Sequence, residues 1–296
     1  MDIFRKINIL FTKFIKIKSD ECKLVSEIGV IMTGLAFPDI SPIMFSVAGI
    51  SVRWYSMAYL GGIVLAWIWL IRDIKKYNFS FDSSAVEDII FYITVGIIIG
   101  GRVGYALFYG GNYFWHEPWQ ILALWKGGMS FHGGAVGAVL GLWYAASRHK
   151  IDFWQLTDLA ALYAPIGIFF GRLANFVNDE LWGRVTNVAW AVRFPSGGYL
   201  PRHPSQLYEA CCEGLLMLIL LNCLWRFVPQ VRERKGTVSA LFVVLYAMFR
   251  IILENFRQPD AQLGFYFGVI TMGQILSVPL LVFGVCLLWH KFRPVK

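Results

Sequence analysis

The sequence predicts an all-α membrane protein with seven transmembrane helices and a small cap at the membrane surface. Hydrophobic residues make up 57% of the 296 residues and charged residues only 16%, and the mean hydropathy is +0.56. A soluble domain averages about 25% charged and about 45–50% apolar residues. A chain this apolar has too little polar surface to cover itself in water, and its 17% aromatic residues suit anchoring at two membrane–water interfaces.

The apolar runs predict the individual spans, because a transmembrane helix needs about 20 mostly apolar residues. The predicted spans are residues 53–71, 87–109, 129–147, 155–176, 207–226, 237–256 and 270–290. They belong to a predicted transmembrane catalytic domain at 37–296. The longest polar interruption, about 177–206, is rich in Gly, Pro, Arg and Asn and predicts the cap.

Residues 1–36 form a basic extension in front of that domain. The stretch MDIFRKINILFTKFIKIKSDECK is too charged to span a membrane and lacks the pattern of a signal peptide, and it fits an amphipathic helix in the membrane plane. Its basic residues would lie outside in the topology predicted below. We therefore hypothesise that the natural start is Met32 rather than Met1, which N-terminal sequencing of the natural protein would decide.

The formal charge of +8 reflects the loops between the spans, and we expect no nucleic-acid partner. Lys and Arg gather in four short clusters, a pattern typical of cytoplasmic loops near anionic lipid. If the first span runs inward, the inner segments hold twelve of these residues and the outer loops four. This count predicts a cytoplasmic C-terminus.

The cysteines and acidic residues predict neither a disulfide framework nor a metal site. Four of the five cysteines lie in apolar runs, where Cys behaves as a small hydrophobic residue. No C-x-x-C or D-x-x-D array occurs in the sequence. We expect no metal and no other cofactor.

Ionisable residues inside spans cost about 2.5–3.5 kcal/mol each on insertion scales and are candidates for a functional site. Those of the predicted spans are Arg102, His132, Asp158, Arg172, Glu209, Glu213, Arg250 and Glu254. Most fall toward the outer ends of their helices in the predicted topology. They therefore predict one polar pocket that opens toward the outer leaflet.

The stretch GRLANFVNDELWGR, residues 171–184, is the sharpest of these signals. Arg172, Asn175, Asn178 and Asp179 recur at spacings of three and four, so they share one face if the helix continues. An Arg fork with neighbouring amides and the carboxylate of Glu180 could grip a phosphodiester and its hydroxyls. The alternative is an Arg–Glu pair that only closes the helix end, and spacing alone does not decide.

Two further patterns also allow a purely structural interpretation. His132 lies between paired glycines, could exchange a proton near neutral pH, and could equally be a packing residue; the glycines after it suit helix–helix packing. Tyr246, Arg250 and Glu254 form one stripe along a helix, which could be an internal salt bridge. In RHPSQLYE, residues 202–209, the helix start predicts that Glu209 faces inward.

Several long motifs in one order resemble the prolipoprotein diacylglyceryl transferases of bacteria. The motifs are ISVRWYSMAYLGG (50–62), HGG (132–134), GRLANFVNDELWGR (171–184), RHPSQLYE (202–209), FRIILENFRQPDAQ (249–262) and TMGQILSVP (271–279). The likeness covers the chain from about Phe37 to the final span. One departure is Ala174, where the family usually has Gly.

The resemblance implies the reaction and its place. The family moves the sn-1,2-diacylglyceryl group from phosphatidylglycerol to the lipobox cysteine thiol of prolipoproteins, which forms a thioether and releases glycerol 1-phosphate. This is the first step of lipoprotein maturation. It takes place in the bacterial inner membrane, among membrane lipids, with the active site and the cap toward the periplasm and without a metal.

The resemblance also implies the residues of the site. The catalytic residues it implies are His132, Arg172 and Arg250, and the substrate-binding residues are Tyr55, Asn175, Glu180, Gly183, Tyr246 and Glu254. In this interpretation the two arginines hold the phosphate and His132 is the base for the substrate thiol. The enzyme's own cysteines are not needed.

Two other classes of protein fit some of the same residues. A proton-coupled transporter would also carry ionisable residues in its spans, although the sequence shows no internal repeat. A phosphatidyltransferase acts on lipid headgroups too, but usually needs a metal-binding carboxylate cluster. Detection of a diacylglyceryl group in thioether linkage to a peptide would separate the three.

Overall fold

The computed structural model describes residues 34–47, 49–77, 79, 81, 83–108, 113–259, 266 and 270–293. The basic extension lies outside these residues, apart from 34–36. The described chain divides into two compact units. One contains residues 34–38 and Val185–His203, and the other contains Asp39–Arg184 and Pro204–Lys296, within the described ranges.

The smaller unit is held by short strands, and its segment Val185–His203 falls inside the predicted cap. Strand β1 (Leu35–Ala36) pairs in parallel with β4 (Val192–Arg193). Val192 and Arg202 exchange two backbone hydrogen bonds of 2.9 Å each. The ring of Phe194 is fully buried and lies 5.5 Å from that of Phe37, centroid to centroid. These contacts give the unit its own small core.

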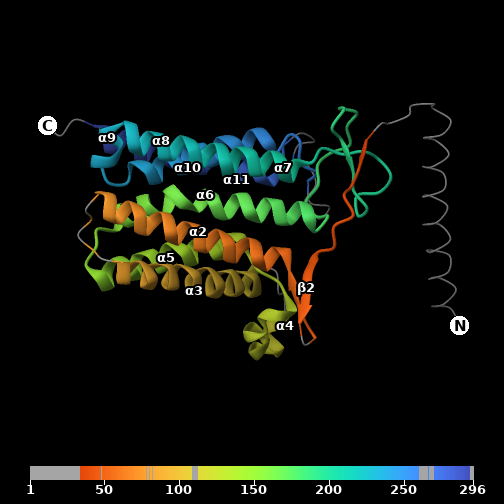
Figure 1. Cartoon of the computed structure of the whole chain (residues 1–296), viewed down its shortest axis with the longest axis horizontal. Coiled ribbons are helices and arrows are strands. Elements are labelled where there is room, and N and C mark those ends of the chain that lie inside the picture. The colour runs from red at the N-terminus through yellow and green to blue at the C-terminus, as the bar shows by residue number, and fades with distance from the viewer. Residues whose placement is uncertain are drawn as a thin grey trace, which may run out of the picture. The chain divides into compact units, whose positions relative to one another are not determined.

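The larger unit is a bundle of helices preceded by a hairpin of β2 (Ile43–Val47) and β3 (Ile50–Arg53) (Figure 1). The long helices are α2 (Trp54–Tyr77), α3 (Ser83–Phe108), α5 (Phe131–His149), α6 (Phe153–Val177), α10 (Thr237–Leu253) and α11 (Met272–Phe292). Another runs without a break through α7 (Ser205–Glu209), the π-helical η3 (Ala210–Leu216) and α8 (Met217–Phe227). The short helices are α4 (Tyr113–His116), η1 (Pro118–Leu122), η2 (Leu124–Lys126) and α9 (Pro229–Glu233).

A helix occurs at each of the seven predicted spans. Among the described residues, five helices are long and apolar enough to cross a membrane: Trp54–Tyr77, Ala85–Phe108, Phe153–Val177, Ser205–Phe227 and Met272–Phe292. Helix α10 is apolar but shorter, and α5 is not among the five. The prediction of a multi-pass, mainly helical membrane protein is therefore confirmed. The all-α description missed the two small sheets, whose strands are only two to five residues long.

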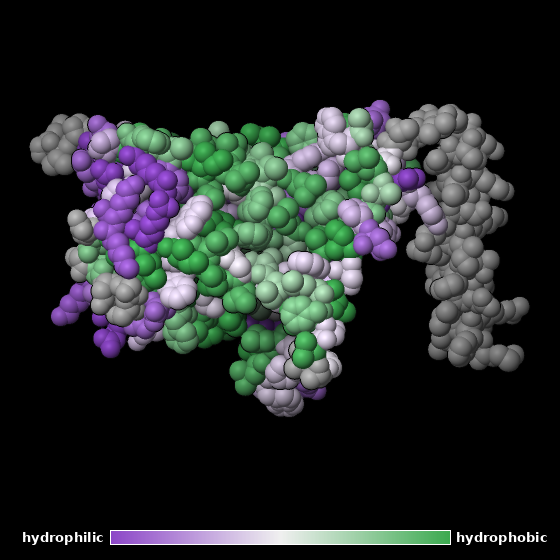
Figure 2. All heavy atoms as spheres, viewed as in Figure 1, coloured by the Kyte–Doolittle hydropathy of each residue, from purple (hydrophilic) through white to green (hydrophobic). Residues whose placement is uncertain are grey.

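Helix α6 lies in the middle of the bundle and packs against α2, α5, α8 and α10 (Figure 1). Its buried Leu159, Leu162 and Ile166 share a core with Met217 and Leu221 of α8. Large apolar side chains cover much of the visible outer face, and hydrophilic ones gather at the end near α9 (Figure 2). A central α6 lets residues near its C-terminal end meet several helices at once.

A row of glycines joins α3 to α5. The glycines recur every four residues and face each other: Gly96, Gly100 and Gly104 on α3, and Gly133, Gly137 and Gly141 on α5. A Cβ atom added at Gly137 would collide with the backbone of Gly96, so the two backbones touch. Small residues at every fourth position let membrane helices approach this closely. The predicted role of the glycines after His132 is thus confirmed.

We expect Gly137→Ala to lower the free energy of unfolding, because the added methyl group has to force α3 and α5 apart. Overpacking of this kind typically costs about 1–3 kcal/mol. Thermal unfolding in detergent, followed by circular dichroism, measures the loss. Gly61→Ala on α2 is the matched control, since nothing lies within 4 Å of the added atom there. Equal melting temperatures for the two variants would contradict the prediction.

Candidate active site

A buried cluster of arginines and glutamates joins α6, the α7–α8 helix and the C-terminal end of α10. Its centre is Glu209, whose carboxylate Oε2 lies 2.9 Å from Nη1 of Arg172. The other oxygen, Oε1, lies 3.0 Å from Nη1 of Arg250 and 3.5 Å from Nη1 of Arg257. One carboxylate therefore brings three guanidinium groups together, one on Oε2 and two on Oε1.

Two further glutamates complete the cluster. Glu213 lies 3.3 Å from Nη2 of Arg172 and 3.9 Å from Nη1 of Arg250. Glu254 lies 2.7 Å from Nη2 of Arg250, one helical turn away on the same helix. The three positive and three negative charges balance. Because an unpaired charge is strongly disfavoured in a protein interior, this mutual pairing makes the burial possible.

The helix that carries Glu209 and Glu213 changes its winding between them. Glu209 ends α7, and Glu213 lies inside the π-helical turn η3. Both side chains are fully buried. A Cβ atom on Gly214 would lie 2.7 Å from Cα of Phe169, so this turn approaches α6 closely. Single π-helical turns occur often at functional sites, and here the turn carries a glutamate that contacts Arg172.

The end of α6 forms a second group of polar side chains. The helix ends at Val177, with Asn178 as its C-cap residue. Asn175 donates a hydrogen bond of 2.8 Å from Nδ2 to Oε1 of Glu180, and Asn178 a longer one of 3.4 Å. Asp179 has a φ of 55°, so the chain leaves the helix before this residue. The predicted helical face therefore stops at Asn178, and Asp179 is not part of it.

The remaining predicted binding residues fall around these two groups. Tyr55, near the start of α2, lies close enough to Glu180 and Arg172 to interact with their charges, and its hydroxyl is 3.2 Å from that of Tyr59. Tyr246 on α10 interacts in the same way with Arg172 and with other members of the cluster.

Gly183 forms an antiparallel bridge with Arg257, which brings the stretch after α6 to the end of α10. The structure thus places Gly183 beside the backbone of a residue whose side chain belongs to the cluster.

His132 occupies a different setting. It lies in the first turn of α5, whose N-cap Ser130 accepts a hydrogen bond from the backbone of Gly133. Its side chain is exposed, and its ring contacts that of Phe131. Among the described residues, no hydrogen bond or ion pair joins His132 to the arginine–glutamate cluster. Its proposed part in the chemistry therefore depends on the substrate bringing the thiol to it.

Two arginines of this region were not singled out from the sequence. Arg257 contacts Glu209, and Arg184 donates to the backbone carbonyls of Arg257 and Glu254, at 3.0 and 3.1 Å. The spacing of Arg250, Glu254 and Arg257, four and three residues apart, was a signal for Arg257, although α10 itself ends at Leu253. Arg184 acts on backbone atoms 70 residues away, which no spacing rule reveals.

Arg102 and Asp158 were expected in the same pocket, and for both the expectation is wrong. Arg102 donates to backbone carbonyls of the 120–128 segment, among them Ile121 at 2.9 Å and Ala123 at 3.0 Å. Asp158, near the start of α6, accepts hydrogen bonds from the backbone of Gly236 and Ser239 at 2.6 and 2.7 Å. Both side chains therefore pair with backbone groups that need a hydrogen-bond partner, and their role is structural.

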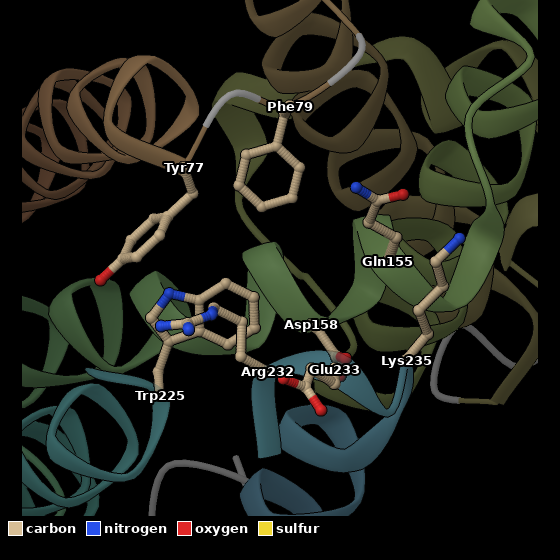
Figure 3. Close-up of a pocket in the computed structure, with 8 residues that line it drawn as sticks. All are labelled: Tyr77, Phe79, Gln155, Asp158, Trp225, Arg232, Glu233 and Lys235. Atoms are coloured by element: carbon tan, nitrogen blue, oxygen red, sulfur yellow. The ribbon is translucent and has the colours of Figure 1, made fainter. Parts of the chain in front are cut away.

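A cavity of about 420 Å³ adjoins Asp158 (Figure 3). Its lining residues are Tyr77, Phe79, Gln155, Asp158, Trp225, Arg232, Glu233 and Lys235. The lining contains two cations and two carboxylates, so it carries no net formal charge. None of its residues belongs to the arginine–glutamate cluster, and the cavity is therefore a separate feature.

The comparisons with known proteins decide the family. A family model described as prolipoprotein diacylglyceryl transferase matches residues 42–290. The chain belongs to the prolipoprotein diacylglyceryl transferase family. The matched range contains the whole arginine–glutamate cluster, His132 and the end of α6. The resemblance seen in the sequence is thus confirmed.

Curated relatives carry the same name in full, phosphatidylglycerol–prolipoprotein diacylglyceryl transferase. The one from Legionella pneumophila (strain Lens) is 46% identical over 258 residues, which cover 87% of this chain and 99% of the relative. That of Mannheimia succiniciproducens is 46% identical over 260 residues, covering 88% and 96%. That of Nitrobacter winogradskyi is 45% identical over 262 residues, covering 86% and 89%.

We expect Glu209→Gln to destabilise the fold strongly, because it leaves three arginines with fewer carboxylates. Breaking a buried ion pair typically costs about 3–5 kcal/mol. Chemical unfolding in detergent measures the change. The matched control is Glu233→Gln, which removes an exposed carboxylate that lines the separate cavity. A loss no larger than that of the control would show that the cluster does not depend on Glu209.

Proposed function

We propose that the arginine–glutamate cluster and the end of α6 form the site at which this phosphatidylglycerol–prolipoprotein diacylglyceryl transferase carries out the first step of lipoprotein maturation. Its substrates are phosphatidylglycerol and prolipoproteins. The family match supports this reaction over a transporter or a phosphatidyltransferase. The observation that carries the proposed site is the pair of guanidinium groups held on the two oxygens of Glu209.

The transfer exchanges one bond at a glycerol carbon for another. The thiol sulfur of the lipobox cysteine attacks the carbon that carries the phosphate ester, and a carbon–sulfur bond forms. The carbon–oxygen bond breaks, and its electron pair leaves with the phosphate as glycerol 1-phosphate. A phosphodiester becomes a monoester, so negative charge grows on the phosphate as the bond breaks.

Arg172 and Arg250 are suited to stabilise that charge. Their planar groups match phosphate oxygens, and Glu209 fixes both in place before the substrate arrives. Donors that are already aimed at developing charge lower the barrier without reorganising during the reaction. Each guanidinium has five N–H groups, so contacts with the glutamates leave donors for the phosphate.

His132 is the proposed base for the substrate thiol. A Cys thiol has a pKa of about 8.5 and is mostly protonated at neutral pH, whereas only the thiolate is a strong nucleophile. A neutral imidazole can accept that proton. The exposed position of His132 at the start of α5 leaves its ring accessible to a second substrate.

The remaining site residues are proposed to bind the glycerol part of the lipid. Glu180, held by Asn175, offers a carboxylate to hydroxyl groups. Tyr55 and Tyr246 add phenol groups that interact with Arg172, and Gly183 pairs with the backbone of Arg257. Glu254 orients Arg250 through their 2.7 Å contact.

We also propose that α5 and α10 cross the membrane with the other five helices, which gives seven spans. Support comes from α5, whose glycines follow α3 over more than two turns, and from α10, which packs along α11 and α6. The excess of Lys and Arg in alternate loops supports a C-terminus in the cytoplasm and a cluster toward the periplasm of the inner membrane.

We expect Arg172→Ala to lower the turnover of phosphatidylglycerol by about 100-fold or more, because loss of a donor to developing charge costs about that much. Transfer from labelled phosphatidylglycerol to a lipobox peptide measures the rate. Arg148→Ala removes a basic residue at the C-terminal end of α5 and serves as the control. Full turnover of a normally folded Arg172→Ala enzyme would rule out the phosphate-binding role.

We expect His132→Gln to lower the rate at least about tenfold, since general base catalysis typically contributes 10²–10⁴. The same assay should show a smaller defect at high pH, where the substrate thiol ionises without help. Because His132 is exposed, the change should leave the melting temperature nearly unaltered. A smaller loss, or one that does not depend on pH, would assign the base to another residue.

A further inference from the structure

Two residues with side chains adopt the left-handed backbone conformation on either side of Glu180. Asp179 has a φ of 55° and Leu181 a φ of 59°. This region is disfavoured for residues other than glycine, and such a backbone persists only where surrounding contacts impose it. The turn 179–181 is therefore strained, and contacts with the surrounding residues have to keep it in this conformation.

Two side chains at the start of α7 hold this turn. Ser205 donates from Oγ to the carbonyl of Leu181 at 3.0 Å, and Gln206 donates from Nε2 to the carbonyl of Glu180 at 2.6 Å. Their exposed fractions are 1% and 0%. These two residues belong to the RHPSQLYE motif, in which the reaction as described gives a part to Glu209 but none to Ser205 or Gln206.

Gln206 is fully buried, and its hydrogen bond to the carbonyl of Glu180 explains why a polar residue occupies this position. Its Oε1 atom has no hydrogen-bond partner within the part of the chain that the structure describes. A buried amide with one unsatisfied end is costly, and an apolar residue would fill the same space more cheaply. The N–H group that reaches the carbonyl of Glu180 is thus the feature that distinguishes glutamine from leucine here.

The strained turn decides where the carboxylate of Glu180 lies. With Asp179 and Leu181 left-handed, the chain reverses after α6, and Glu180 donates its backbone N–H to Asn175 at 3.1 Å. The same reversal brings the side-chain oxygen Oε1 to Nδ2 of Asn175. A relaxed turn would rotate Glu180 away from this amide.

We propose that Ser205 and Gln206 are positioning residues, which impose the left-handed turn 179–181 and thereby aim Glu180 at the lipid substrate. The proposal rests on the proposed function, in which Glu180 binds the glycerol part of phosphatidylglycerol. Neither residue touches the substrate. They act through the backbone of the residues that do.

The test uses the different backbone preferences of glycine and alanine. Glycine adopts a positive φ without steric cost, so Leu181→Gly removes the strain at residue 181, whereas Leu181→Ala retains it. Leu181 is 37% exposed, and shortening it removes little packing. If Gln206 acts against strain, its loss should matter much less when residue 181 is glycine.

The experiment measures kcat/KM for labelled phosphatidylglycerol in purified full-length enzyme. We expect Gln206→Leu to lower it at least about tenfold in the wild-type and Leu181→Ala backgrounds, and less than about threefold in the Leu181→Gly background. Such a difference between backgrounds is a coupling between the two positions. Equal losses in the three backgrounds would overturn the proposal.

Asn222→Leu is the matched control. Asn222 is also a buried amide on the same long helix, and its Nδ2 donates to the carbonyl of Leu162 at 3.2 Å, away from the turn. Its effect on kcat/KM should be the same in all three backgrounds, because it does not act on the strained turn. If Leu181→Gly rescued Asn222→Leu as well, the rescue would be general and the proposal would fail.

Glu180→Ala separates this proposal from the proposed function. Full activity of Glu180→Ala would refute the role of Glu180 in substrate binding. If Glu180→Ala is impaired, Gln206→Leu should add less than about a twofold loss to it, since both changes remove the same interaction. Additive losses would overturn the positioning role alone. Should Gln206→Leu fail to fold, Ser205→Ala takes its place in each background with the same expected pattern.

Discussion

The carboxylate of Glu209 is the contact on which the site depends. Glu209 joins Arg172 of α6 to Arg250 of α10 and to Arg257, which follows α10, and it lies on the helix between them in sequence. Three chain segments are thereby fixed at one point. Because the charges are largely buried and balanced, removing any one of the six charged side chains leaves the cluster with one uncompensated charge. Stability and the placement of the phosphate-binding groups therefore have the same origin.

Local spacing predicted those parts of the site that lie on one helix. Arg250 and Glu254, four residues apart, form the expected pair, and the inward position of Glu209 is confirmed by its full burial. The partners of Arg172 could not be predicted, since they lie about 40 residues away and one of them lies in a π-helical turn. Asp179 was misplaced because helical spacing cannot reveal where a chain turns left-handed.

The positions of the helices were more predictable than the partners of the charged side chains. Apolar runs located every long helix, because membrane burial demands them. Charge alone, however, did not indicate which polar residues belong together. Arg102 and Asp158 resemble Arg172 in the sequence, yet they bind backbone groups at helix ends and loops. A buried charge in a membrane helix thus belongs either to a reactive site or to hydrogen bonds that satisfy backbone groups. Only the contacts of the side chain distinguish the two roles.

The glycine row between α3 and α5 also limits how a lipid can reach the cluster. A phospholipid that enters sideways from the bilayer has to pass between two helices with its acyl chains trailing behind. Where the backbones of α3 and α5 touch at Gly96 and Gly137, no gap as wide as a hydrocarbon chain exists. These two helices therefore form a closed wall, and a phospholipid that enters sideways has to pass between another pair of helices.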